Sequence, residues 1–171
     1  MFDPLRTFPY LRASLKLNMA ELVVYTDGAS RGNPGPGGYG VVLIWGNVRK
    51  ELSQGYRKTT NNRMELLAVI VALEALKKDG LTVTIFTDSK YVVDSIEKGW
   101  LWGWVKINFK DKKNKDLWLR FIPLYKRHQV KMQWVKGHAS NPFNNRCDEL
   151  ATAAADSGNW LIDEGFEKGL A

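Results

Sequence analysis

The chain is poor in the residues that form disulfides and zinc sites. Its 171 residues include one cysteine, Cys147, and two histidines. A single cysteine excludes an internal disulfide and leaves no partner for a cysteine-based zinc site. We interpret Cys147 as a small buried side chain, and because a reducing compartment is the simplest setting for such a chain, we expect a cytoplasmic protein.

Long apolar runs are also missing. No run approaches the roughly 18 residues that a membrane helix needs, so we expect no membrane span. Residues 1–20 lack the apolar stretch of about 7 to 15 residues found in a secretory signal, and we interpret them as a leader or upstream-start extension that is poorly ordered. A chain of this length favours one domain, placed at 21–156, followed by a C-terminal tail at 157–171, and we expect a monomer.

Acidic residues are fewer than basic ones, 18 against 25, and the basic excess lies mostly in one segment. Residues 100–136 carry ten Lys or Arg and only two Asp, interleaved with Trp100, Trp102 and Trp104. A solvated basic face that aids solubility is one interpretation of the charge alone. The aromatic residues favour nucleic acid, because charges meet its backbone and rings meet its sugars or bases.

Apolar periodicity and turn residues predict three strands with short connections, followed by alternating helices and strands. Short connections imply antiparallel neighbours, and the later alternation implies a mixed sheet covered by helices. The expected strands are 22–26, 39–45, 50–56, 82–87 and 130–135, and the expected helices begin near 61, 89, 117 and 146.

Two of the expected strands run into the same pair of residues, Thr-Asp. Asp27 follows "LVVYT" and Asp88 follows "VTIFT". Either Asp taken alone is well explained as a turn former or a helix cap. The end of a strand is also where open α/β sheets commonly place a binding site, so two such carboxylates side by side would mark one edge of the sheet.

A third acid lies in the helix expected to begin near residue 61. Helical spacing places Glu65 above small apolar residues such as Ala68, with no basic partner ahead of it. Glu74 is an internal comparison, because Lys77 and Lys78 lie three and four residues further on and predict an exposed ion pair. Glu65 therefore needs another explanation.

Asp148 precedes Ala151 and Ala155 in the last expected helix. An acid in a first turn after Asn144 and Asn145 is favoured by the helix dipole, and for Asp148 alone that explanation suffices. Four acids facing a small-residue core would repel one another unless a cation were bound. Oxygen ligands without clustered His or Cys favour Mg²⁺ or Mn²⁺ over zinc, and two such ions suit an in-line phosphoryl displacement.

His138 lies in the loop "KGHASNPFNN" between the last expected strand and helix. A lone histidine in a loop is commonly an exposed bystander. Beside a metal site it would instead carry a proton to or from the nucleophile or the leaving group.

Five segments, in order and at matching spacing, resemble type 1 ribonuclease H. They are "TDGASRGNPGPGGYG", "TTNNRMEL", "FTDSKYV", "DLW" and "WVKGHASNPFNNRCDELA", within residues 21–156. The resemblance implies an α/β fold with a mixed five-stranded sheet, three antiparallel strands being followed by strands parallel to the first. It implies Mg²⁺-dependent endonucleolytic hydrolysis of the RNA strand of RNA/DNA hybrids, leaving 5′-phosphate and 3′-hydroxyl ends.

The resemblance also implies roles for individual residues. The metal-binding acids would hold two Mg²⁺ ions, with Mn²⁺ as a possible substitute, and the loop histidine would assist turnover. Other matching residues would contact the hybrid, the tryptophans in the channel for the DNA strand. The catalytic set is Asp27, Glu65, Asp88, His138 and Asp148, and the substrate-binding set is Asn33, Thr60, Asn61, Asn62, Trp100 and Trp104.

Two departures from the family pattern bear on affinity. The basic protrusion after Trp104 is shorter than in other bacterial forms, and Lys90 stands where relatives often have Gln. Two alternatives to a catalytic ribonuclease remain at this point. One is a non-catalytic nucleic-acid-binding module of the same fold, which the complete set of four acids disfavours. The other is the ribonuclease H portion of a reverse transcriptase.

Overall fold

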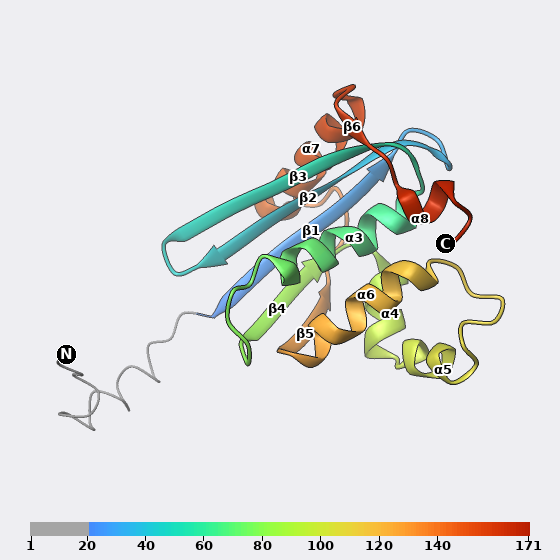
Figure 1. The fold of residues 1–171 in the computed structure, drawn as a ribbon. Helices are drawn as coiled ribbons and strands as arrows, with labels where there is room; N and C mark the ends of the chain where they lie inside the picture. Colours follow the sequence, from blue (N-terminus) through green and yellow to red (C-terminus); the bar gives the residue numbers. More distant parts are fainter. Residues whose placement is uncertain (1–20) are drawn as a thin grey trace, which may run out of the picture.

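The computed structural model describes residues 21–171, so the leader expected at 1–20 lies outside the described residues. One mixed sheet organises the chain, in the strand order β5-β4-β1-β2-β3-β6 (Figure 1). The strands are β1 Leu22–Ser30, β2 Gly35–Trp45, β3 Val48–Thr59, β4 Thr82–Thr87, β5 Gln129–Trp134 and β6 Trp160–Leu161.

The pairing confirms the predicted mixed sheet. Strands β1, β2 and β3 form an antiparallel meander, whereas β4 runs parallel to β1 and β5 runs parallel to β4. The strand count differs from the expected five, because β6 adds two residues in parallel to Gly55 and Tyr56 at the β3 edge. Two residues are too short to show the alternation that identifies a strand in sequence.

Helices cover both faces of the sheet. Helices α3, α4 and α6 lie on the face turned toward the viewer in Figure 1, and α7 lies behind it against β1, β2 and β3. The helices are α3 Asn61–Glu74, α4 Lys90–Glu97, α5 Trp100–Lys106, α6 Lys115–Lys126, α7 Pro142–Asp156 and α8 Glu164–Glu167. Within residues 21–171, no helix combines the length and the apolar character needed to cross a membrane.

The central helix α3 is buried nearly all round, as its sequence predicts. Met64, Leu66 and Ile70 are fully buried between the sheet and helix α6. The helix begins after Thr60, whose hydroxyl accepts a hydrogen bond from the backbone nitrogen of Arg63 at 3.4 Å. Thr is a favoured N-cap because its oxygen binds a backbone N–H that has no partner within the helix.

Several boundaries differ from those expected. Strand β1 continues to Ser30 and β2 begins at Gly35, because the Gly-rich segment pairs with β1 up to Ser30 and Gly37 instead of forming a long turn. Helix α7 begins at Pro142 with Asn141 as its cap, four residues earlier than expected. Asp148 therefore lies in the second turn, where the helix dipole explains it less well.

The ion pair expected for Glu74 is also wrong. Helix α3 ends at Glu74 itself, so Lys77 and Lys78 no longer follow it along a helix face. Its carboxylate instead accepts two hydrogen bonds from Arg120 of helix α6, at 2.6 and 2.8 Å. The residue is exposed and paired, as predicted, but with a tertiary partner that local spacing does not reveal.

Candidate metal and nucleic-acid site

Three carboxylates from three different elements meet at one edge of the sheet. One oxygen from each of Asp27, Glu65 and Asp88 can be chosen so that all three lie within 4.8 Å of one another. Asp27 lies on β1, Glu65 on α3, and Asp88 directly after β4. The first two are buried and Asp88 is partly buried.

Parallel pairing brings the two Thr-Asp sequences together. In the register of β1 and β4, Thr26 lies opposite Thr87, so Asp27 and Asp88 follow at equivalent places. Both acids are expected at strand ends, which holds for Asp88 but not for Asp27. Asp27 lies inside β1, whose pairing with β2 continues opposite Gly40 after the pairing with β4 has ended. The Asp27 carboxylate thus lies at the point where the parallel pairing of β1 with β4 ends.

Close backbone packing brings Glu65 to the strand. A Cβ atom built on Gly28 would collide with the backbone of Met64 and Glu65. Only glycine allows helix α3 to approach β1 this closely, because it has no side chain. Gly28 therefore determines how closely the helix that carries Glu65 approaches Asp27.

Helix α7 brings the fourth acid from the opposite face. Gly40 lies beside Asp27 in the β1–β2 register, and a Cβ there would collide with the backbone of Cys147. Asp148 follows Cys147 and lines the same pocket of about 440 Å³ as the other three acids. Cys147 itself is buried, as predicted.

Burial and mutual repulsion shift the acids toward their protonated forms. Burial, with the charges of Asp88 and Asp148, raises the pKa of Asp27 to about 8. Burial, followed by the charges of Asp27 and Asp88, raises the pKa of Glu65 well above its ordinary value. The pKa of Asp88 is raised as well, chiefly by burial. A cluster of this kind is unfavourable to ionise without a cation.

The donor atoms fit a hard divalent cation. Oxygen Oε2 of Glu65 is buried and, in the described part of the chain, has no hydrogen-bond partner. Gly28 donates one hydrogen bond to Asp27 Oδ1, at 2.9 Å, which leaves further acceptor capacity on that carboxylate. All-oxygen ligation by carboxylates is what Mg²⁺, Mn²⁺ and Ca²⁺ prefer. The geometry is therefore compatible with divalent metal binding.

His138 lies at the mouth of this site. It is exposed, has a positive φ of 52°, and lines the same pocket as the four acids. Lys90 lines the pocket too, and its ammonium lies 5.0 Å from the ring centre of Trp134. A lysine and a histidine therefore line the same open pocket as the four carboxylates.

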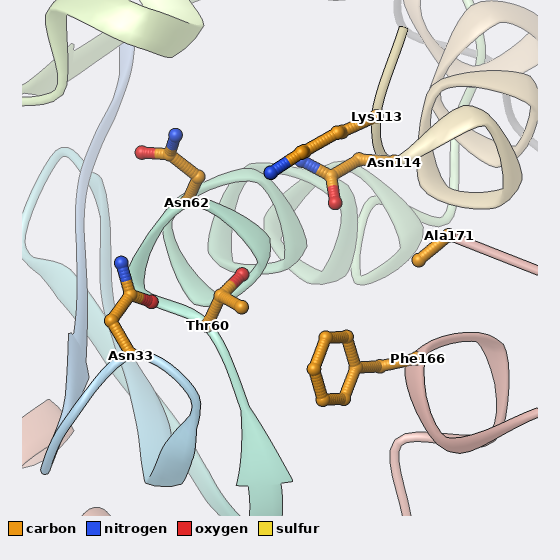
Figure 2. Close-up of a pocket in the computed structure, with 7 residues that line it drawn as sticks. All are labelled: Asn33, Thr60, Asn62, Lys113, Asn114, Phe166 and Ala171. Atoms are coloured by element: carbon orange, nitrogen blue, oxygen red, sulfur yellow. The ribbon is translucent and has the colours of Figure 1, made fainter. Parts of the chain in front are cut away.

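The uncharged residues expected to contact a hybrid lie around the start of helix α3. The backbone nitrogen of Asn61 donates a hydrogen bond to Asn33 Oδ1 at 3.1 Å, which joins the β1–β2 loop to the helix. Asn61 and Asn62 also line the pocket of the acids. Asn33, Thr60 and Asn62 line a neighbouring pocket (Figure 2). The structure thus brings these four residues together.

The two tryptophans expected to contact the hybrid lie in different environments. Trp104 packs edge-on against Trp118, with ring centres 5.8 Å apart, and lines a pocket with Asn62. Trp100 is 47% exposed, and the ammonium of Lys98 lies 5.3 Å from its ring centre. Only Trp104 lies beside the Asn-rich start of helix α3.

The sequence did not predict two residues that line the pocket beside Trp104. Asn114 and Tyr91 line the pocket that contains Trp104, and the amide nitrogen of Asn114 donates a hydrogen bond to the Tyr91 hydroxyl at 3.0 Å. Asn114 has a left-handed backbone, with φ 65°, directly before helix α6. An Asn between Lys residues and a helix is a usable signal for such a turn, because Asn tolerates that conformation.

This chain is similar to proteins of the RNase H family. The RNase H family model matches residues 19–156. Ribonuclease H of Desulforamulus reducens is 55% identical over 151 residues, covering 85% of this chain and 94% of the relative.

Solved structures share the fold. The structure of LC9-RNase H1, a type 1 RNase H with the type 2 active-site motif, aligns with a TM-score of 0.74 at 33% identity and covers 90% of this chain and 82% of that chain. LC11-RNase H1, solved in complex with an RNA/DNA hybrid, aligns with a TM-score of 0.63 at 26% identity, over 81% of this chain and 99% of that chain. The match to the family model and the high identity to a curated relative over most of both chains show that this chain belongs to the RNase H family.

Proposed function

We propose that the protein is an endonuclease that hydrolyses the RNA strand of RNA/DNA hybrids with two bound Mg²⁺ ions, Mn²⁺ being a possible substitute. The convergence of Asp27, Glu65 and Asp88 within 4.8 Å carries the proposal, because a family member without catalysis would have no need of this repulsive cluster. Family membership supports the reaction, and the similar fold of a ribonuclease solved with a hybrid supports the substrate.

Asp27, Glu65, Asp88 and Asp148 would hold the ions. When bound, two ions shared by carboxylates supply an activated water and stabilise the leaving oxygen of an in-line displacement. Water adds to the phosphorus while the P–O3′ bond breaks, which leaves a 5′-phosphate and a 3′-hydroxyl. The chain contributes a site whose acids are fixed by backbone contacts at Gly28 and Gly40, so that the ligands are in place before substrate arrives.

His138 is suited to move a proton at the edge of the site. Its ring lies on an exposed loop between β5 and α7, lining the pocket of the acids from its solvent side. An imidazole has a ring nitrogen that can accept a proton and then donate it, so His138 can pass a proton between the site and solvent. We assign it to protonation of the departing 3′ oxygen and to turnover.

We assign contacts with the sugar–phosphate backbones to Asn33, Thr60, Asn61 and Asn62. Amides and hydroxyls bind phosphate oxygens without charge, and they also recognise the 2′-hydroxyl that distinguishes RNA from DNA. Trp104, with the basic residues that follow it, extends this surface for the second strand. The ammonium of Lys112 lies 5.7 Å from the ring centre of Trp104, so charge and ring are presented together.

The test compares cleavage of an end-labelled RNA/DNA hybrid, double-stranded RNA and double-stranded DNA in Mg²⁺. We expect cleavage of the RNA strand of the hybrid alone, and none in EDTA. Binding of the hybrid without cleavage in either Mg²⁺ or Mn²⁺ would reject catalysis. Full activity in EDTA would reject the metal mechanism.

A further inference from the structure

The pocket of Figure 2 is built from parts of the chain that are far apart in sequence. It has a volume of about 250 Å³. Three lining residues belong to the proposed hybrid contacts, two precede helix α6, and two come from the C-terminal segment, here defined as residues 160–171. They are, in that order, Asn33, Thr60, Asn62, Lys113, Asn114, Phe166 and Ala171 (Figure 2). The C-terminal segment, which shows no informative sequence pattern, thus forms one wall of the pocket.

Arg63 forms hydrogen bonds that join helix α3, helix α6 and the C-terminal segment. Its side chain is 1% exposed, and it follows Asn62 in helix α3. Two hydrogen bonds, at 2.8 and 2.7 Å, join it to Asp116 of helix α6. Two more, both at 2.7 Å, join it to Asp163 of the C-terminal segment. One guanidinium therefore connects helix α3, helix α6 and the C-terminal segment.

The same guanidinium contacts a pocket residue. Arg63 donates a fifth, longer bond from Nη1 to Asn114 Oδ1 at 3.4 Å. Asn114 is itself buried, and its amide nitrogen donates to Tyr91, which also lines the pocket of the acids. The orientation of the Asn114 amide is thus determined by Arg63 on one side and Tyr91 on the other.

Asp163 accepts further hydrogen bonds besides those from Arg63. The hydroxyl of Thr59, the residue before the α3 cap, donates to Asp163 Oδ2 at 2.6 Å. Asp163 also caps helix α8, which presents Phe166 to the pocket (Figure 2). One carboxylate therefore orients Arg63 and at the same time begins the helix that carries the pocket wall.

Stability alone is a weak explanation for this arrangement. Buried ion pairs often contribute less to stability than well-packed apolar residues of similar size, because both charges lose their hydration. They do impose a specific geometry through directional bonds. The geometry imposed here is that of Asn114, Phe166 and the start of helix α3, which are walls of one pocket.

We propose that Arg63 and Asp163 are positioning residues through which the C-terminal segment shapes the pocket that receives the hybrid backbone. This inference rests on the proposed function. Asp163 keeps Arg63 oriented toward Asn114, while helix α8 places Phe166 opposite Thr60. Loss of either contact leaves the acids in place but loosens the surface that binds substrate.

Steady-state cleavage of the hybrid by Asp163→Asn and Phe166→Ala tests the proposal. We expect KM to rise several-fold with kcat and the Mg²⁺ dependence unchanged, the pattern produced by losing binding that ground and transition states share. A destabilised but otherwise intact site would not separate KM from kcat in this way. Assays are run well below the Tm of each variant.

Glu167→Gln is the matched control. Glu167 lies in the same helix as Phe166, but its carboxylate pairs with the exposed Arg57 and does not line the pocket. We expect the KM of this variant to equal that of the wild type, because exposed ion pairs contribute little.

If Asp163→Asn does not fold, Phe166→Ala tests the part of the inference that concerns the C-terminal segment as a pocket wall, and an unchanged KM in this variant alone overturns the inference. An unchanged KM in Phe166→Ala and in folded Asp163→Asn would overturn the inference while leaving the proposed function standing. A wild type that does not cleave hybrids would overturn the proposed function instead. The same variants are then compared by fluorescence anisotropy with labelled hybrid, where unchanged affinity would reject the positioning role.

Discussion

Gly28 of strand β1 lies so close to Glu65 of helix α3 that a methyl group on Gly28 would overlap the Glu65 backbone nitrogen. The contact joins two of the three clustered acids, because Asp27 precedes Gly28. A single hydrogen atom in place of a side chain thus determines how closely two carboxylates approach each other.

We predict that Gly28→Ala impairs both stability and turnover. The helix must shift to admit the methyl group, and such overpacking costs about 1–3 kcal/mol. Displacement of a catalytic group by about 1 Å lowers the rate by about a hundredfold. Gly103→Ala is the control, because its added methyl meets nothing within 4 Å. Equal kcat values and unfolding midpoints for the two variants would contradict this account.

Asp27→Asn should lower activity while raising the stability of the metal-free protein. Turnover should fall by at least about a hundredfold, the scale on which one electrostatic group in a catalytic site acts. Holding this carboxyl protonated up to about pH 8, when its ordinary pKa is 3.8, costs stability at neutral pH, so its removal should raise the Tm in EDTA. Glu74→Gln, which disrupts an exposed pair with Arg120, should leave kcat unchanged.

Stability of the metal-free protein should fall as pH rises from about 4 to about 8. Over this range the Asp27 carboxyl ionises in the unfolded chain, with an ordinary pKa of 3.8, but stays protonated in the folded one up to about 8. The unfolded state therefore binds fewer protons, and the free energy of unfolding decreases with pH. Thermal unfolding in EDTA at pH 5 and pH 8 measures the slope. The slope should be shallower in Asp27→Asn, and an equal slope would assign the effect to other groups.

Mg²⁺ should stabilise the wild type and should do so through the acidic cluster. A ligand that binds only the folded state at about a hundred times its Kd adds about 2.7 kcal/mol. We expect the Tm to rise with Mg²⁺ concentration in the wild type and to respond little in Asp27→Asn. A similar rise in both proteins would show that the ion acts elsewhere on the chain.

The basic protrusion should set the salt dependence of hybrid binding. Lys112, beside Trp104, is placed to meet one phosphate, so Lys112→Gln should reduce the slope of log K against log salt by about one. Lys77→Gln is the control, because Lys77 follows the C-terminal end of helix α3, opposite to Asn61. Anisotropy titrations at several salt concentrations measure both slopes.

Local patterns were sufficient for most of the elements and for the grouping of the acids. The Thr-Asp sequences at 26–27 and 87–88 predict two adjacent strands, and β1 and β4 do pair in that register. Element ends were less well predicted, since pairing extends β1 to Ser30 and the side chain of Asn141 caps α7 so that the helix begins at Pro142. The partner of Glu74 could not be predicted, because Arg120 is distant in sequence and near only through the packing of α3 on α6.

By itself the sequence determined which residues carry oxygen ligands, which stretches are apolar, and where basic and aromatic residues alternate, since these are properties of residue type and spacing. Only the tertiary structure decided that Arg63 joins Asp116 and Asp163, and that Phe166 and Thr60 line the same pocket. The physical reason is that such contacts depend on how far layers approach and how side chains are oriented after burial. Neither the distance between layers nor the orientation of a buried side chain can be read from the spacing of residues along the chain.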